Sequence, residues 1–422
     1  MASTLPAPLP DPLTLREVDP DDPAALDAFM AQVSLVFSNP VRHTAERRDF
    51  RRSAGVDHRL LGTFDGERIV GTYRSWETRV TLPGGALLPA NAVSSVTVRP
   101  THRRRGILSA MITKDLTDAA ARGLPAAVLI AAESVIYGRF GFGPATETAT
   151  WHLDVRRTVP RPRAGAGGRT EVVDPSEVRH LAPAVFEAAR LPGAMDREPW
   201  WWDVTCEITR WPGDPVVPQA CVLHREDDGT PSGYAFYTWK ENGHGVDAMA
   251  TIVVGDLQAA TGGARTALWS FFASLDLVAT VRAEDRPVDD PLPGLLVDAR
   301  AARRTASADF LWIRLLDPAA ALAARTYECP GRVSLRVTDP LGHATGTYVL
   351  DVAGDGTATV TRTDDDADLT LPVDVLSSVY LGAGDLYAAG LAGRVDEHSP
   401  GAAARLARIL RTTRAPWTGT WF

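Results

Sequence analysis

A chain of 422 residues with 45% hydrophobic, 23% charged and 7% aromatic residues has the composition of a globular protein, which excludes a disordered or fibrous one. This length exceeds what one hydrophobic core ordinarily supports and predicts two or three domains. The net charge of −8 and the pI of about 5.6 argue against nucleic-acid binding, which needs Lys and Arg at phosphates. The negative charge suits a cationic partner, although proteins that bind no cation often carry a similar charge.

The cysteine and hydropathy patterns indicate the compartment. Cys206, Cys221 and Cys329 are widely spaced and form neither a disulfide framework nor a zinc pattern, so no metal site is expected. The segment 1–16 is rich in proline and lacks the apolar stretch of a signal peptide. No run approaches the roughly 18 apolar residues of a membrane span. We therefore expect a cytoplasmic protein with no membrane partner.

The first part of the chain is expected to alternate helices and strands. Asp65-Gly66 is a hairpin turn signal, Pro100 must stop the strand before it, and Gly123 ends a helix. The expected elements, in chain order, are a helix at 24–37, strands at 60–64, 68–80 and 92–98, a helix at 104–122, a strand at 126–132, a short helix from Ser134 and a strand at 147–155.

Composition breaks divide the rest of the chain. The stretch 156–169, rich in Pro and Gly, is expected to be a linker. A second mixed unit, with a strand at 233–240 and a helix at 263–275, extends to about Leu316. Short strands and then two helices follow: strands at 333–337, 347–352, 357–361 and 368–371, and helices at 373–380 and 402–410. We predict an α+β protein of three domains, residues 1–158, 159–316 and 317–422.

The segment 96–108 is expected to bind a phosphate. A strand ends there, a Pro-containing turn follows, and a helix opens with Arg103, Arg104, Arg105 and Gly106. The first four amide N–H groups of a helix lack intrahelical partners, and the helix dipole is positive at that end, so that it suits a pyrophosphate. Gly106 would let the phosphate approach the backbone. Three arginines can also be a solvated helix end, but the order of strand, proline and helix favours the phosphate site.

This segment resembles the coenzyme-A loop of the GNAT superfamily of N-acetyltransferases, Arg/Gln-x-x-Gly-x-Gly/Ala, from which it departs at Leu108. A second run, IYGRFGFGPA at 136–145, combines closely spaced glycines with a tyrosine and an arginine, and packing alone explains it poorly. Together, THRRRG and IYGRFGFGPA resemble the enhanced intracellular survival (Eis) family of actinobacteria, which acetylate aminoglycosides at several positions. The region 296–324, the run 379–382 and the terminal Phe422 extend the resemblance along essentially the whole chain.

The resemblance implies two tandem GNAT-type acetyltransferase-like domains, then a sterol-carrier-protein-like domain, in a homohexamer. Only the first domain carries the loop, so it alone should bind acetyl-CoA. By similarity, strand amides at 96–98 would hold the pantetheine and acetyl oxygen, the helix start the pyrophosphate, and Ala132 with Glu133 the pantetheine arm. The full set of cofactor-binding residues implied is Val96, Thr97, Val98, Arg103, Arg104, Arg105, Gly106, Ile107, Leu108, Ser109, Ala132 and Glu133.

The same resemblance implies two catalytic residues. Tyr137 matches the family's general acid, and a phenol with a pKa of about 10 can protonate a departing thiolate. Tyr137 could instead be a core tyrosine whose hydroxyl donates to a backbone carbonyl. Phe422 matches the residue whose terminal carboxylate, with a pKa of about 3.5, is the general base. Alternatively, Phe422 merely docks the tail together with Trp417 and Trp421.

We therefore expect transfer of acetyl from acetyl-CoA to a small cationic amine, an aminoglycoside acetylated at more than one position. Trp421 stands where family members often carry an acidic residue, which weakens the aminoglycoside assignment. The enzymatic alternative is a protein-lysine or polyamine acetyltransferase. An alternative of another class is a lipid carrier acting through the C-terminal domain. It is disfavoured because such domains need an open apolar tunnel, and the chain end is expected at the active site.

Overall fold

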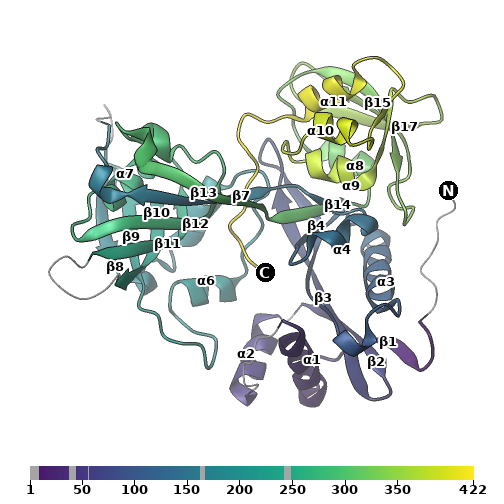
Figure 1. Ribbon diagram of the computed structural model, residues 1–422, viewed down its shortest axis with the longest axis horizontal. Helices are drawn as coiled ribbons and strands as arrows, with labels where there is room; N and C mark the ends of the chain where they lie inside the picture. The colour runs from purple at the N-terminus through teal and green to yellow at the C-terminus, as the bar shows by residue number, and fades with distance from the viewer. Residues whose placement is uncertain (1–8, 38–43, 56, 162–166, 242–248) are drawn as a thin grey trace. The chain divides into compact units, whose positions relative to one another are not determined.

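The structure, a computed structural model, describes residues 9–37, 44–55, 57–161, 167–241 and 249–422. The chain forms two compact units (Figure 1). The first contains the chain up to Thr146, residues 310–416 and the last two residues, and the second contains residues 147–309 and 417–420. No described helix is long and apolar enough to cross a lipid bilayer.

The first unit contains, in its described part, a seven-stranded sheet in the order β1-β2-β3-β4-β5-β14-β6. Alternate residues of its strands enter different cores, because successive side chains of a strand face opposite sides. Leu61 and Val70 pack with α3, whereas Leu60 and Ile69 pack with α1. The elements are β1 (Leu13–Glu17), α1 (Pro23–Val36), α2 (Ala45–Ala54), β2 (Arg59–Asp65), β3 (Arg68–Thr81), β4 (Leu87–Val98), α3 (Ile107–Ala121), β5 (Ala126–Ile130), α4 (Ser134–Tyr137), β6 (Gly143–Pro144) and β14 (Leu311–Leu315).

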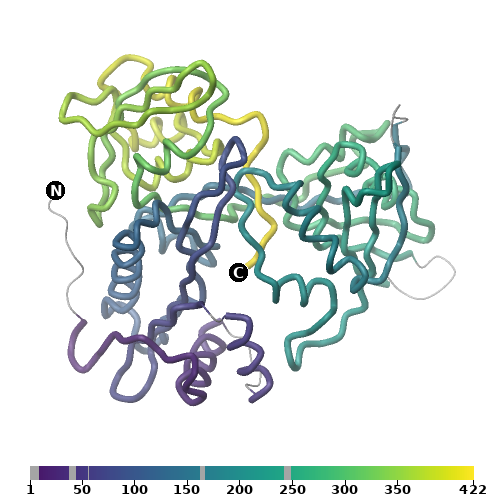
Figure 2. Tube along the Cα trace, turned by 180° about the vertical axis from the view of Figure 1, so that it is seen from behind, coloured from purple at the N-terminus to yellow at the C-terminus, as the bar shows by residue number. Residues whose placement is uncertain are grey.

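A second sheet of the first unit, with order β17-β16-β15-β18-β19, is formed by the C-terminal part of the chain. Figure 2 shows it in green and yellow, next to the first sheet. Its helix α9 packs on β14 and β6 of the first sheet. The elements are α8 (Pro318–Ala324), β15 (Gly331–Thr338), β16 (Gly346–Val352), β17 (Ala358–Thr363), β18 (Leu369–Pro372), α9 (Val373–Val379), α10 (Leu386–Leu391), β19 (Asp396–Glu397) and α11 (Ala402–Leu410).

The second unit has its own sheet, β13-β7-β12-β11-β10-β9-β8, and α7 packs Trp269 and Phe272 into its core. The tail residue Trp417 belongs to this unit, where its indole N–H donates to the carbonyl oxygen of Asp285 at 2.8 Å. The elements are β7 (Glu147–Asp154), β8 (Arg169–Val173), α5 (Ala182–Ala189), α6 (Pro199–Thr205), β9 (Ala220–Arg225), β10 (Pro231–Glu241), β11 (Ala250–Ala259), α7 (Gly262–Ala273), β12 (Val278–Pro287) and β13 (Ala302–Asp309).

The predicted α+β class is confirmed, but two strands lie across the boundaries expected at 158 and 316. β7, expected in the first domain, is a strand of the second unit's sheet, and β14, expected in the second domain, lies between β5 and β6. The units therefore divide at Thr146 and Asp309. Backbone pairing decides this exchange, and a composition break gives no sign of it. Helix α2 was not anticipated, and residues 162–166 of the expected linker lie outside the described residues.

Candidate functional site

The site begins where β4 separates from β5. Residues 90–93 of β4 pair in parallel with residues 126–129 of β5. Beyond Val93 and Leu129 the two strands do not pair within the described residues. Ser95 has a φ of +52°, and the register of β4 with β3 shifts there. A bulged residue of this kind bends its strand and turns the following side chains to the other face. The backbone of 96–98 therefore lies along an open strand edge, as the resemblance implied.

The turn after β4 leads into the start of α3. His102 is fixed there because its ring forms hydrogen bonds with Asp65 at 3.1 Å and with Thr101 at 2.8 Å. Gly106 precedes the first residue of α3 and has a φ of +79°, and a Cβ at this position would meet no protein atom within 4 Å. The conformation of the backbone therefore favours glycine here, and packing within the protein does not demand it. This reason differs from the one expected from sequence, which was room for the phosphate alone.

Gly106→Val is expected to raise the dissociation constant for acetyl-CoA at least about tenfold, or roughly 1.4 kcal/mol. A β-branched residue is strained at positive φ, so the start of α3 would move and its amides would no longer converge on the pyrophosphate. Calorimetric titration of acetyl-CoA measures the change. Gly106→Asn is the matched variant, because Asn adopts this conformation more readily, and its affinity should lie nearer the wild type. An unchanged titration of folded Gly106→Val would contradict the assignment.

A cavity of about 390 Å³ opens between this strand edge and the starts of α3 and α4. It brings together Tyr137 and all the predicted cofactor residues except Arg105 and Ala132. Both of those are exposed and do not line it. Four lining residues had no role assigned from the sequence: Val36, at the end of α1, His102, Ile136 and Arg139. The lining residues are Val36, Val96, Thr97, Val98, His102, Arg103, Arg104, Gly106, Ile107, Leu108, Ser109, Glu133, Ile136, Tyr137 and Arg139.

Tyr137 is buried at the end of α4 but reaches the cavity. Its hydroxyl forms no hydrogen bond with any described residue, so the structure does not support the alternative of a core tyrosine bonded to a carbonyl. Burial, and secondarily the Glu133 carboxylate, raises the pKa of Tyr137 to about 12. The phenol therefore keeps its proton at neutral pH and holds it more strongly than an ordinary tyrosine with a pKa near 10.

The glycines after Tyr137 have a structural explanation. Gly141 has a φ of +86°, and a Cβ there would approach Arg314 Nε and Val373 Cγ1 to 2.7 Å. A Cβ at Gly143 would overlap the carbonyl oxygen of Asp374 in α9. Close packing of this turn on the C-terminal part of the unit therefore explains both glycines, contrary to the expectation that packing alone would not.

The chain end lies on β3. The Phe422 ring meets Trp76 edge-on with centroids 5.5 Å apart, and the Trp421 ring meets Phe310 at 4.8 Å. Trp76 stacks on His58 at 4.6 Å. Within the described residues, Phe422 does not line the cavity that contains Tyr137. The expected docking of the ring is therefore present, and the role of its carboxylate stays a prediction.

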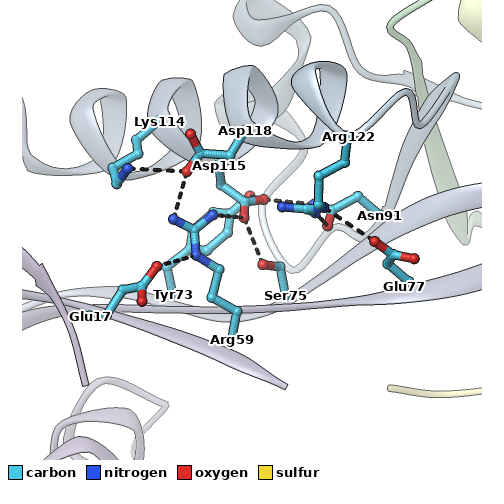
Figure 3. Close-up of polar contacts among 10 residues, drawn as sticks. All are labelled: Glu17, Arg59, Tyr73, Ser75, Glu77, Asn91, Lys114, Asp115, Asp118 and Arg122. Atoms are coloured by element: carbon cyan, nitrogen blue, oxygen red, sulfur yellow. Dashed lines mark hydrogen bonds and ion pairs between the residues drawn. The ribbon is translucent and has the colours of Figure 1, made fainter. Parts of the chain in front are cut away.

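A buried carboxylate ties α3 to the sheet beneath the site (Figure 3). Asp115 of α3 is fully buried and accepts hydrogen bonds from Tyr73 at 2.9 Å, Ser75 at 2.6 Å and Asn91 at 2.7 Å. Arg59 of β2 lies 3.4 Å from the same carboxylate. These donors come from three strands, so one charge fixes α3 against the bulged region of the sheet.

Asp115→Ala is expected to lower the free energy of unfolding by about 3–5 kcal/mol, because it leaves buried donors and the Arg59 cation without their acceptor. Urea denaturation of the two proteins measures the difference. The control is Asp118→Ala: Asp118 also binds Arg59, at 2.6 Å, but is 32% exposed. Its loss should cost no more than about 1 kcal/mol. Equal losses in the free energy of unfolding would show that the buried network stabilises the protein no more than the exposed ion pair does.

Comparison with known proteins identifies the domains. Residues 17–145 and 193–315 each match a family model described as acetyltransferase (GNAT) domain, and residues 318–419 match a sterol carrier protein domain. These matches confirm the expected order of two acetyltransferase-like domains and a sterol-carrier-like one.

Similar proteins occur in actinobacteria. An uncharacterized N-acetyltransferase of Streptomyces avermitilis is 42% identical over 378 residues, 88% of this chain and 90% of that protein. The N-acetyltransferase Eis of Mycobacterium tuberculosis is 37% identical over 332 residues, 76% of this chain and 78% of Eis. The crystal structure of Eis1 from Mycobacterium abscessus superposes with a TM-score of 0.83 at 33% identity, covering 97% of this chain and all of that one.

Proposed function

The chain belongs to the Eis family of N-acetyltransferases within the GNAT superfamily, and we propose that its first unit transfers acetyl from acetyl-CoA to a cationic amine, with Tyr137 as general acid and the Phe422 carboxylate as general base. The observation that carries this proposal is the cavity in which Tyr137 faces the open edge of β4 and the start of α3. Aminoglycosides acetylated at more than one amine are the first substrates to test.

The lining residues fit acetyl-CoA, whose thioester would supply the activated acetyl group. The start of α3, preceded by Gly106 in its left-handed conformation, offers amides and a positive dipole to the pyrophosphate. Arg103 and Arg104 line the cavity and would neutralise the phosphates, whereas the exposed Arg105 would contribute only from a distance. The amides of 96–98 would bind the pantetheine and the acetyl oxygen, and Glu133 would flank the arm.

Each proposed catalytic residue would transfer one proton. The Phe422 carboxylate, directly or through water, would accept the proton that the amine loses as its nitrogen forms the bond to the acetyl carbon. Tyr137 would donate its proton to the sulfur as the carbon–sulfur bond breaks. Because its pKa is raised to about 12, Tyr137 would hold the proton until negative charge develops on the sulfur. The products are the acetylated amine and the free thiol.

One observation favours an acceptor with less positive charge than an aminoglycoside. The guanidinium of Arg74 lies 4.7 Å from the ring of Trp76, the residue on which Phe422 rests. A cation on the ring that contacts Phe422 makes this region less favourable for a polycationic drug, and Trp421 supplies no acidic contact. A lysine side chain of a peptide is therefore the second candidate. A polyamine is the third candidate, because it carries several positive charges, as an aminoglycoside does.

A lipid carrier is the least supported alternative. Two large polar side chains, Arg325 and Tyr380, occupy the interior of the sterol-carrier-like part. Arg325 is buried there and donates to the carbonyl oxygens of Tyr380 and Leu410, and the Tyr380 hydroxyl donates to the carbonyl of Ala321 at 2.7 Å. Buried arginine and tyrosine groups that bind the backbone occupy space that an apolar tunnel would need.

We further propose that the protein is a homohexamer, by family resemblance. We also propose that it is cytoplasmic, because Cys206, Cys221 and Cys329 are free thiols.

A thiol-release assay with acetyl-CoA tests the proposal against a panel of aminoglycosides, polyamines and lysine peptides. Release that depends on an added amine supports acetyl transfer, and the ranking of kcat/KM identifies the acceptor class. The absence of release with every amine, together with stabilisation by fatty acyl ligands and not by acetyl-CoA in a thermal-shift comparison, would favour the lipid carrier.

A further inference from the structure

The position of Tyr137 depends on the turn that follows it. The amide of Phe142 donates to the Tyr137 carbonyl oxygen at 3.3 Å, and the amide of Gly141 donates to Gly138 at 2.9 Å. The Phe142 ring, fully buried, meets the Tyr137 ring edge-on with centroids 6.1 Å apart. Any shift of residues 141–143 would therefore move the phenol.

One buried hydroxyl of α9 holds this turn. The Ser377 Oγ donates to the carbonyl oxygen of Gly141 at 3.3 Å and accepts from the amide of Leu315 in β14 at 3.2 Å. Ser377 is completely buried. The hydroxyl group donates its single hydrogen to the turn and accepts a hydrogen from β14. Ser377 therefore connects the turn, the strand and α9.

Close packing also restricts the position of the turn at residues 141–143. Gly141 and Gly143 bring its backbone so close to α9 that a methyl group fits at neither position. Arg314 of β14 donates to Asp339, in the loop after β15, at 2.6 Å, and both side chains are fully buried. This ion pair fixes β14 to the sheet of the sterol-carrier-like part. Because the packing is this close, the position of the turn depends directly on the position of α9.

We propose that Ser377 is a positioning residue for Tyr137, and that the sterol-carrier-like part of this chain serves as a rigid support for the catalytic turn. The inference rests on the proposed role of Tyr137 as general acid. Without its hydroxyl at residue 377, the Gly141 carbonyl and the Leu315 amide lose their shared partner and the turn gains freedom. The phenol then points less accurately at the sulfur, and misplacement of a catalytic group by a fraction of an ångström lowers turnover.

The test is a double-mutant cycle. Ser377→Ala should lower kcat about three- to tenfold, with an unchanged dissociation constant for acetyl-CoA, at a temperature well below unfolding. In the Tyr137→Phe background the same substitution should lower kcat no further, because the group it positions is gone. The matched control is Ser378→Ala, whose hydroxyl donates to Val375 of its own helix at 2.8 Å, and which should keep the wild-type kcat.

The outcomes separate the two hypotheses. If Tyr137→Phe alone retains full kcat, the proposed catalytic role fails. If Tyr137→Phe is impaired but Ser377→Ala has the wild-type kcat, or lowers kcat by the same factor in both backgrounds, Ser377 contributes only to the fold and the inference is overturned.

Discussion

Replacement of Tyr137 by phenylalanine is expected to lower kcat by about 10²-fold and to leave the affinity for acetyl-CoA nearly unchanged. The substitution removes only the hydroxyl, which is the group that would protonate the departing sulfur. The Tyr137 hydroxyl forms no hydrogen bond with a described residue, so its loss should leave no buried partner unsatisfied. Steady-state kinetics with saturating amine and calorimetry with acetyl-CoA separate the two effects.

A matched control is Tyr327→Phe, which removes a buried tyrosine hydroxyl away from the cavity, where it donates to Leu322 at 2.6 Å. It should affect stability and not kcat. Full kcat in Tyr137→Phe, with Tyr327→Phe also active, would make Tyr137 a packing residue and require another acid.

The pH dependence of the wild type gives an independent check on Tyr137. A group whose pKa is raised keeps its proton until the pH rises through that raised value. With a pKa of about 12, the acid form of Tyr137 is fully present between pH 6 and pH 10. We therefore expect kcat to show no loss near pH 10 that depends on Tyr137. A decline with an apparent pKa near 10, absent from Tyr137→Phe, would mean that binding of the substrate cancels the effect of burial.

The sequence predicted well which residues gather at the candidate site, because they belong to short contiguous segments. The order of strand, Pro100 and Gly106 specifies a strand end and a helix start in neighbouring positions, and the structure places them at one cavity. The cavity likewise contains Tyr137, which the motif alone had indicated. Arg105 and Ala132 do not line the cavity, since neighbours in a motif can face opposite sides of a turn, and their role toward the cofactor stays a prediction.

What the sequence did not predict depends on contacts between distant segments. The bulge at Ser95 has no residue signature, because it is set by how β4 must pair with β3 on one side and leave β5 on the other. The exchange of β7 and β14 between sheets is decided by pairing partners more than 100 residues apart, such as Leu153 with Ala302. The glycines at 141 and 143 were assigned to the chemistry because α9, the helix that requires them, lies far along the chain.

Removal of Phe422 is expected to abolish most turnover while the protein stays folded. Deletion moves the terminal carboxylate to Trp421, about 3.5 Å back along an extended chain, and proton transfer needs a heavy-atom separation of about 3 Å. The Trp421 ring already packs on Phe310, so it cannot replace the Phe422 ring on Trp76 without leaving that site. Extension of the C-terminus should be as harmful, because it converts the acid into a neutral amide, whereas an N-terminal tag should leave kcat unchanged.

Two further variants separate the charge of Phe422 from its ring. Phe422→Ala keeps a carboxylate on the same backbone atom but loses the contact with Trp76, so kcat should fall less than on deletion, through poorer placement. A C-terminal amide at Phe422, made by ligation of a synthetic peptide, keeps the ring and removes only the charge, and kcat should fall as far as on deletion. If the amide form were as active as the acid, with the N-tagged protein as reference, the Phe422 ring would be only an anchor on Trp76. The proton of the amine would then pass to water or to a side chain.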